Sequence, residues 1–264
     1  MVVGQSEYGP GVPKMQEIPM HVAVYPDLDT ISQQAAQYIV RVANEAIVTR
    51  GRFTIALSGG NTPKKLYSLL GSEPYRSQID WKLVDIFWSD ERCVPPDNPD
   101  SNYRMAHEVL LSKIQIPAPQ VHHMPADTPD REAASLAYTQ EMQQVFGTNG
   151  IPNFDLIQLG MGPEGHTASL FPHQPSLHET ERLVIPVSVP KPPPDRLTFT
   201  PPILNAARNV LFLVTGADKA DALHAVLEGE YNPDEYPAQI VRPPNGEVTW
   251  MVDTAAAKNI RLRQ

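Results

Sequence analysis

The sequence predicts an α/β protein in which helices cover both faces of a doubly wound, mainly parallel sheet. Short apolar segments of strand length alternate with longer segments of helical periodicity through most of the 264 residues. This alternation is typical of parallel sheets, because two parallel neighbours need a long crossover connection that is usually a helix. No repeat or linker divides the chain, so residues 21–264 are expected to form one domain after a flexible arm at residues 1–20.

Seven short apolar runs are expected to form the strands. Each is five to eight residues long, is rich in Val, Ile, Leu or Phe, and lies between turn-forming residues. In chain order they are His21–Tyr25, Phe53–Leu57, Val84–Trp88, Phe154–Leu159, Arg182–Val189, Val210–Thr215 and Val248–Val252.

The helices between these strands are recognised by apolar residues three and four positions apart and by residues that cap helix ends. They include a helix through residues 31–46 that Gly51 ends, and Arg131–Phe146, which Gly147 ends. A third helix is expected to have Asn61 or Thr62 as its cap and Pro63 in its first turn, and a fourth to run from Ser101 to about Ile114. The last two are Ala217–Leu227, which Gly229 ends, and a helix capped by Asp253.

Composition excludes several classes of protein. Apolar residues make up 41% and charged residues 19%, as in an ordinary globular protein. The net charge of -9 disfavours binding to nucleic acid or an acidic membrane, because like charges repel. The single cysteine, Cys93, excludes an internal disulfide framework and favours a reducing compartment. With no signal peptide and no apolar run of about eighteen residues, we expect a cytoplasmic protein.

The segment Ser58–Pro63 is a candidate phosphate-binding loop. It follows a predicted strand and opens a predicted helix, and its two glycines, Gly59 and Gly60, let backbone N–H groups face inward. The partial positive charge of a helix N-terminus adds to this, so a phosphate is a natural occupant. A tight turn without a ligand fits the segment equally well.

Ser58 has a rival interpretation as the nucleophile of a serine hydrolase. Ala56–Gly60 resembles a nucleophile elbow in which alanine replaces the first glycine. Only one clear strand precedes Ser58, however, whereas several precede the elbow in that fold. We therefore favour a role in binding for Ser58.

Two further segments that follow strands contain candidate catalytic residues. Ser89–Arg92 places Asp90 and Arg92 where a carboxylate and a cation could meet a substrate, although three consecutive charges often form a solvated loop. Gly160–Phe171 presents His166 beside a glycine-rich turn and, we expect, at the start of a helix. Imidazole titrates near neutral pH, and a helix N-terminus would keep it neutral, as a general base must be.

A phosphate ligand on an acidic protein requires a local cluster of positive charge. Lys191, Arg196 and Lys219 could supply it, and Lys191 lies in the proline-rich segment Val189–Pro194, which is expected to be a rigid loop. His122 and His123 are adjacent, so their side chains diverge in an extended backbone, and no Cys, Asp or His spacing completes a metal site. No metal or organic cofactor is therefore expected.

Four separated motifs resemble those of 6-phosphogluconolactonases, in the same order. They are LSGGNTP, SDERCVP with the later Ser101-Asn102, GMGPEGHTASLFP and PKPPPDRLTFT. The resemblance covers the chain from about His21 to its end. It implies a doubly wound α/β fold and the hydrolysis of 6-phospho-D-glucono-1,5-lactone to 6-phosphogluconate, the second step of the oxidative pentose phosphate pathway. Monomer and homodimer fit the sequence equally well.

The resemblance also implies roles for residues. His166 is expected to deprotonate the attacking water, while Asp90 and Arg92 line the lactone end together with Lys191. The substrate-binding residues are expected in the two glycine-rich loops and among the late cations; they are Ser58, Gly59, Gly60, Asn61, Thr62, Gly162, Lys191, Arg196 and Lys219. Such a lactone is an activated ester, so its hydrolysis requires only water, one general base and a hydrogen-bond donor to the oxyanion. Arg92 or a backbone N–H of a glycine-rich loop could be that donor.

Two alternatives remain open. The superfamily also contains glucosamine-6-phosphate deaminase, in which a glutamate helps to open the sugar ring, but Phe171 occupies the matching position and transfers no proton. The second is a noncatalytic sugar-phosphate sensor. Such regulators carry a helix-turn-helix, which twenty N-terminal residues without basic character do not form. Glu164 stands where the lactonase pattern usually has Asp, so its contacts are expected to differ in detail.

Overall fold

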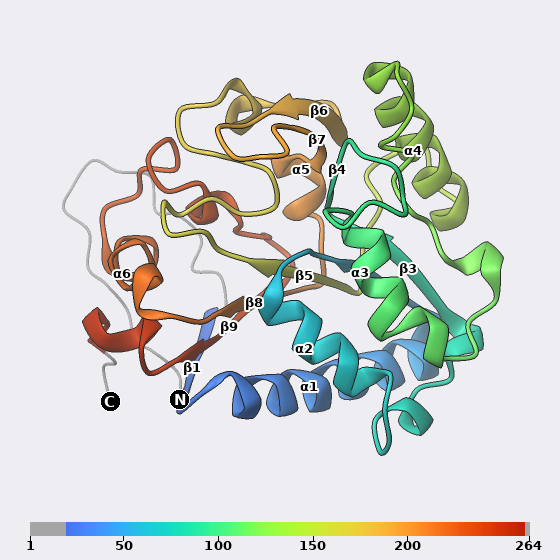
Figure 1. Cartoon of the computed structure of the whole chain (residues 1–264), viewed down its shortest axis with the longest axis horizontal. Helices are drawn as coiled ribbons and strands as arrows, with labels where there is room; N and C mark the ends of the chain where they lie inside the picture. The colour runs from blue at the N-terminus through green and yellow to red at the C-terminus, as the bar shows by residue number, and fades with distance from the viewer. Residues whose placement is uncertain (1–19, 262–264) are drawn as a thin grey trace.

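A computed structural model describes residues 20–261, which contain two β-sheets (Figure 1). The larger sheet has six parallel strands in the order β1-β9-β8-β5-β2-β3, and the smaller has three antiparallel strands in the order β4-β7-β6. The strands of the larger sheet are β1 (Met20–Tyr25), β2 (Phe53–Leu57), β3 (Val84–Trp88), β5 (Leu156–Gly160), β8 (Asn209–Val214) and β9 (Glu247–Asp253). Those of the smaller are β4 (Asp90–Arg92), β6 (Val184–Ser188) and β7 (Asp195–Phe199). The predicted doubly wound α/β fold is confirmed.

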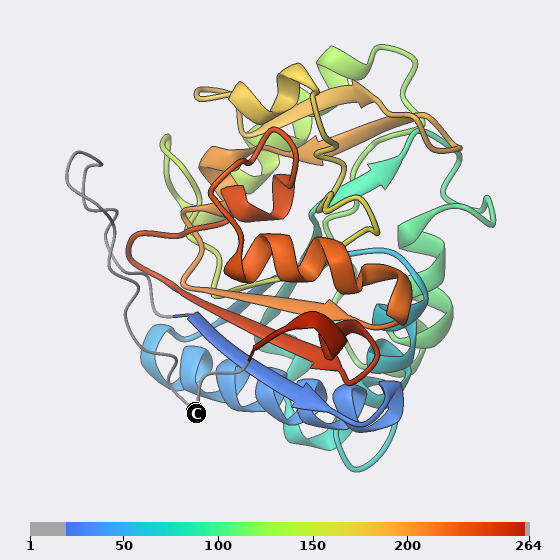
Figure 2. The ribbon, with the colours of Figure 1, turned by 90° about the vertical axis from the view of Figure 1, so that its left-hand side faces the viewer.

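Helices lie on both faces of the larger sheet. α1 (Leu28–Arg50) and α2 (Asn61–Leu70) pack together on one face, and Figure 2 shows α6 (Ala220–Glu228) on the other. The smaller sheet lies on the side away from α1, beside α4 (Arg131–Phe146) and α5 (Pro201–Leu204), and α3 (Asn102–Val109) follows β4. None of the helices within residues 20–261 has the length and apolar character needed to cross a bilayer.

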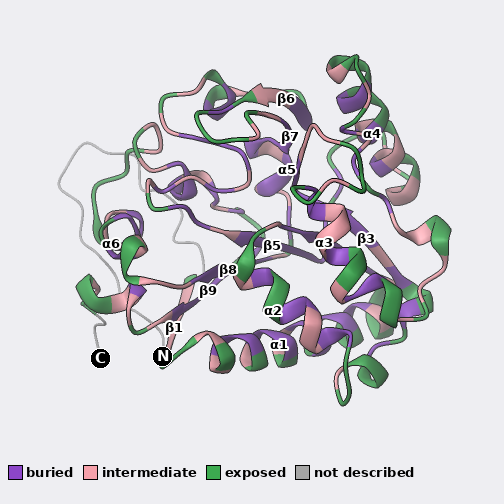
Figure 3. Ribbon diagram, in the orientation of Figure 1, coloured by how far each residue is buried: buried purple, intermediate pink, exposed green. Residues whose placement is uncertain are grey.

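The central strands are buried on both faces, as Figure 3 shows. Helices on one side and the smaller sheet on the other exclude water from them, which explains why their sequences are continuous apolar runs without alternation. Aromatic side chains fill the layers: Phe212 of β8 stacks on Trp250 of β9 at 3.8 Å, and Phe87 of β3 meets the edge of Phe154 at 5.2 Å. The sheet is therefore a rigid support for the loops at its ends.

Several predicted helix ends are confirmed and others are wrong. Gly51 and Gly147 adopt positive φ and end α1 and α4 as predicted. The cap of α2, in contrast, is Gly60, whose φ of 108° disfavours any side chain, so neither Asn61 nor Thr62 is the cap. Asp253 accepts a hydrogen bond from the N–H of Ala256, but it caps a short 3-10 turn and no α-helix.

Two predicted boundaries and one sheet assignment also need correction. α3 begins after Ser101 as predicted but ends at Val109, because Leu110 leaves the helical conformation. The run predicted as a strand at 182–189 forms β6, which pairs antiparallel with β7 in the smaller sheet instead of joining the parallel one. The predicted arm lies outside the described residues, except that Met20 begins β1.

A buried histidine joins β3 to α4 on the edge of the larger sheet. Nδ1 of His122 lies 2.7 Å from a carboxylate oxygen of Glu141, and Nε2 lies 3.3 Å from one of Asp85. Its ring stacks on Phe87 at 4.3 Å. Burial alone would lower the pKa of His122, but the hydrogen bonds to Asp85 and Glu141 outweigh this effect and raise the pKa above its usual value.

We predict that His122 stabilises the fold more at low pH than at high pH. Because its folded-state pKa is raised, its contribution is fully present below the unfolded value of about 6.5 and is lost as the pH rises through the folded value. The free energy of unfolding of His122→Gln, measured in urea, should therefore fall further below the wild type at about pH 6 than at about pH 9. The exposed neighbour His123→Gln is the control. An equal deficit at both pH values would contradict the account.

Candidate active site

The loops singled out in the sequence meet at one edge of the larger sheet. β8, β5, β2 and β3 are neighbours in the sheet and run parallel, so the segments that follow them leave from the same edge. A direct contact joins two of these segments: the hydroxyl oxygens of Thr62 and Thr215 lie 2.8 Å apart. The segments that follow these four strands therefore share one edge of the sheet.

The loop after β2 leads directly into α2. The first N–H groups of an α-helix have no partner within the helix, so those of Asn61 and Thr62 are suited to hold an anion above the N-terminus. Gly59 has a packing requirement of its own, because a Cβ there would overlap the side-chain amide of Asn102. Asn102 in turn donates a hydrogen bond to the carbonyl oxygen of Asp90 at 2.9 Å, which ties this loop to the next.

Ser58 has a different place from the one predicted. Its hydroxyl donates to Gln158 at 2.7 Å, and its backbone N–H donates to the hydroxyl of Tyr67 at 2.9 Å. The side chain is buried, its proton is donated to an amide oxygen, and no histidine or carboxylate in the described part of the chain is among its hydrogen-bond partners. Ser58 therefore anchors the loop, and the polar groups directed outward belong to the residues that follow it.

His166 lies in a loop that contains no helix, contrary to the expectation that it begins one. After β5 the chain turns through Gly162 and Gly165, and the next helical turn begins only at Pro175. The ring lies directly over Gly162, where a Cβ would overlap the imidazole. Phe171 stacks on the ring with centroids 4.1 Å apart and planes at 11°. Packing, instead of a helix dipole, determines where this imidazole lies.

Glu164 provides the charged partner of His166. Its carboxylate oxygen lies 3.0 Å from Nδ1, a close electrostatic contact whose angles differ from those of a hydrogen bond. His166 is the main reason that the pKa of Glu164 falls to about 2, against an opposing effect of burial, and the charge of Lys191 contributes further. Glu164 is therefore ionised throughout the neutral range.

Asp90 and Glu91 are buried, although a run of charges is more often solvated. Asp90 accepts a hydrogen bond from the hydroxyl of Ser169 at 2.6 Å. Glu91 accepts hydrogen bonds from the backbone N–H groups of Arg92, Asn102 and Tyr103, and so holds the N-terminus of α3. From the sequence, only the capping residue Ser101 could have indicated this role of Glu91.

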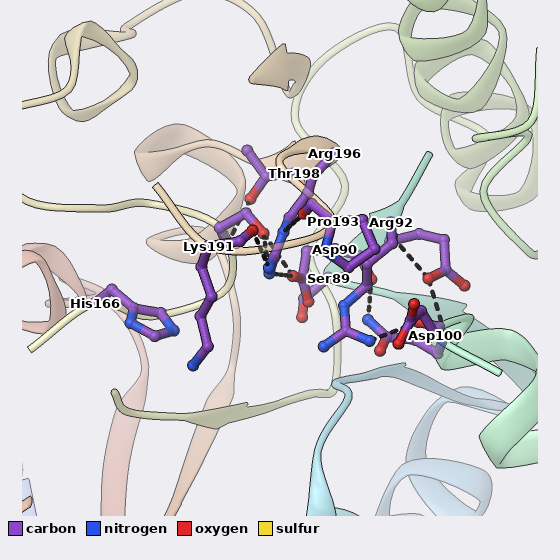
Figure 4. Close-up of polar contacts among 12 residues, drawn as sticks. Ser89, Asp90, Arg92, Asp100, His166, Lys191, Pro193, Arg196 and Thr198 are labelled. Carbon is purple, nitrogen blue, oxygen red and sulfur yellow. Dashed lines mark hydrogen bonds and ion pairs between the residues drawn. The ribbon is translucent and has the colours of Figure 1, made fainter. Parts of the chain in front are cut away.

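The predicted cations divide into an exposed group and a buried one. Lys191 is exposed, and in Figure 4 its side chain lies beside the ring of His166. Lys219 pairs with Asp218 at 2.8 Å, and Lys191 helps to lower the pKa of Asp218, after the larger effect of Lys219. Arg92 is half-buried and donates to the carbonyl oxygen of Asp100. Lys191 therefore places positive charge beside His166, while Lys219 follows β8 and Arg92 lies on the Asp90 and Asp100 side in Figure 4.

Arg196, in contrast, is buried beneath the surface. Its guanidinium donates to the carbonyl oxygens of Pro193 at 3.1 Å and Lys191 at 3.3 Å, and to the hydroxyl of Ser169 at 3.4 Å. Three of its N–H groups are therefore engaged within the protein, and the expected contact with a phosphate stays a prediction. Among residues 20–261, no group of three or more His, Cys, Asp and Glu side chains has the arrangement of a metal site.

Comparison with known proteins identifies relatives over most of the chain. Residues 26–250 match the family described as glucosamine-6-phosphate isomerases/6-phosphogluconolactonase. A 6-phosphogluconolactonase of Synechocystis is 45% identical over 219 residues, which cover 82% of this chain and 88% of that protein. A 6-phosphogluconolactonase of Nostoc is 38% identical, and the aligned residues cover 91% of this chain and 98% of that protein. The solved 6-phosphogluconolactonase of Trypanosoma brucei is 30% identical and superposes with a TM-score of 0.81, covering 93% of this chain and all of the other.

We predict that Gly162→Ala displaces the ring of His166, because the added Cβ would overlap ring atoms. Gly160→Ala is the matched control, since the nearest atom to a Cβ there is 3.9 Å away. Protons of a ring stacked face to face on another are shielded by its ring current, so the Hε1 resonance of His166 reports this packing in proton–carbon NMR spectra. Gly162→Ala should move that resonance and Gly160→Ala should not. An unmoved resonance in Gly162→Ala would show that Gly162 does not place the ring.

Proposed function

This chain belongs to the family of glucosamine-6-phosphate isomerases and 6-phosphogluconolactonases, and we propose that it opens the lactone ring with a water molecule that His166 deprotonates. Its activity is that of a 6-phosphogluconolactonase, a lactone hydrolase that forms 6-phosphogluconate in the pentose phosphate pathway. The proposal concerns which residues carry out this reaction and how.

The observation that carries the proposal is the environment of His166. Nδ1 faces the carboxylate of Glu164, so Nε2 is the nitrogen left to accept a proton from water. When it does, the ring becomes positive beside a carboxylate that is already ionised, and this contact strengthens as the transition state is reached. Phe171 and Gly162 hold the ring in place while it acts. Such a base is typically worth about 10²- to 10⁴-fold in rate.

The reaction is then a simple ester hydrolysis. Water attacks C1 of the lactone while His166 takes a proton from it, and the carbonyl becomes a tetrahedral oxyanion. The oxyanion collapses, the bond from C1 to the ring oxygen breaks, and the proton on His166 passes to that oxygen as it leaves. Lys191 lies beside His166 in Figure 4, and we assign to it, with Arg92 from the neighbouring strand β4, the stabilisation of the oxyanion and of the carboxylate product.

The phosphate is assigned to the N-terminus of α2. Gly59, Gly60, Asn61 and Thr62 form this end of the helix, and Lys219 follows Thr215, whose hydroxyl contacts Thr62. The helix dipole, the unpaired N–H groups of a first turn and one lysine together suit a dianion. The phosphate is distant from C1 in the substrate, so its binding energy serves to orient the lactone at His166.

A deaminase or isomerase activity is not favoured by this site. Phe171 is buried and stacked on His166, so it contributes packing where ring opening of an amino sugar would require a group that transfers a proton.

We also propose a cytoplasmic location, which the single cysteine supports through its preference for a reducing compartment. Some similar proteins of rice are named as chloroplastic.

The activity test follows acid release from freshly prepared 6-phosphogluconolactone, corrected for spontaneous hydrolysis. The wild type should accelerate it, and His166→Ala should lower kcat by about 10²- to 10⁴-fold with little change in KM, since the base acts only in the transition state. The exposed His178→Ala is a control from the same part of the chain. A His166→Ala variant as fast as the wild type would remove His166 from the mechanism.

Glu164 offers a second prediction. Glu164→Gln removes the negative charge beside Nδ1, and kcat should fall by about tenfold, because a charge-assisted contact contributes about 1.5 to 3 kcal/mol when buried and this one is half-exposed. Glu164→Asp keeps the charge and should retain most of the activity. Because the pKa of Glu164 is about 2, the wild-type rate should show no loss from Glu164 protonation down to about pH 4. Equal activities of the Gln and Asp variants would contradict a role for the charge.

A further inference from the structure

We propose that the buried pair of Asp90 and Arg196 is a positioning device: it holds His166 through Phe171 and holds Lys191 through its loop, and neither residue binds the substrate. The inference rests on the proposed role of His166. It assigns to both residues a role different from the catalytic and phosphate-binding ones that their motifs predict.

Phe171 is the link between this pair and His166. Its ring is 1% exposed and stacks on the imidazole, whose own position over Gly162 leaves no room for a side chain there. The guanidinium of Arg196 lies over the Phe171 ring, 5.9 Å from its centroid. A cation at this distance is attracted to the face of an aromatic ring, so Arg196 limits how far Phe171 can move.

The same guanidinium holds the loop that presents Lys191. It donates to the carbonyl oxygens of Lys191 and Pro193, which lie on either side of Pro192. Two hydrogen bonds from one planar group orient that turn of backbone relative to β7. Figure 4 shows Lys191 extending from this loop past His166, with Arg196 behind it beside Asp90. One buried side chain therefore determines the positions of two residues that reach the surface.

Asp90 makes it possible for this charge to be buried. Its carboxylate lies 3.9 Å from Nη1 of Arg196, and the hydroxyl of Ser169 bridges the two, donating to Asp90 at 2.6 Å. Asp90 is 5% exposed and Arg196 3%, so neither presents its charge to a ligand at the surface. A buried charge without its partner is strongly destabilising, which explains why the two must occur together.

The test compares Arg196→Met, the charge-balanced double variant Asp90→Asn with Arg196→Met, and Phe171→Leu. Each is measured for kcat and KM on 6-phosphogluconolactone and for the Hε1 resonance of His166, which His166→Ala identifies. All three variants should move the resonance and lower kcat by about 10- to 100-fold, with KM nearly unchanged, because displacement of a reacting group by about 1 Å costs that much. The double variant and Phe171→Leu still provide a result if Arg196→Met does not fold.

Lys219→Ala is the contrasting control. It lies at the proposed phosphate end, so it should raise KM and leave the resonance in place. If the Arg196 variants instead raise KM as Lys219→Ala does, with kcat and the resonance unchanged, Arg196 binds the phosphate and the proposal is wrong. The resonance reports geometry independently of turnover. If His166→Ala retains full activity while the Arg196 variants still move the resonance, the mechanism fails but the positioning stands.

Discussion

In a parallel sheet every strand ends at the same edge, and this constraint brings the loop before α2 and the loop of His166 to one place. β8, β5, β2 and β3 are neighbours, so the segments after them are brought together although they are separated by more than a hundred residues of sequence. Because these strands are buried on both faces, their ends cannot shift relative to one another. We propose that the substrate is held between two points at this edge, the N-terminus of α2 and the imidazole of His166.

An acidic protein requires local positive charge to bind an anionic substrate. The net charge is -9, yet Lys191 lies beside His166 and close enough to Asp218 to lower its pKa, after the larger effect of Lys219. The nearby carboxylates are each used: Glu164 faces the imidazole, Asp90 neutralises Arg196, and Asp218 pairs with Lys219. Most of these charges are therefore paired within the protein, and Lys191 is the exposed cation next to His166 in Figure 4.

The parts of this arrangement that depend on local patterns could be predicted from the sequence. Phe53–Leu57, Val84–Trp88 and Arg131–Phe146 form their elements with the predicted boundaries, because apolar runs and αL glycines are local signals. Whether a single charged side chain is buried depends instead on residues that are distant in the sequence. Arg196 has the same sequence signal whether it binds a phosphate or supports a loop, and only its contacts with Ser169 and the carbonyl oxygens distinguish the two. For the same reason, the three-residue strand β4 could not be recognised in a run of charges.

A crystal structure of the enzyme with bound 6-phosphogluconate would show whether the substrate spans from the N-terminus of α2 to His166. The account predicts that the phosphate accepts hydrogen bonds from the backbone N–H groups at Gly60–Thr62 and contacts Lys219, with the C1 carboxylate next to Nε2 of His166. A phosphate bound instead by Arg196 or Arg92, or a C1 carboxylate beyond contact with His166, would contradict it.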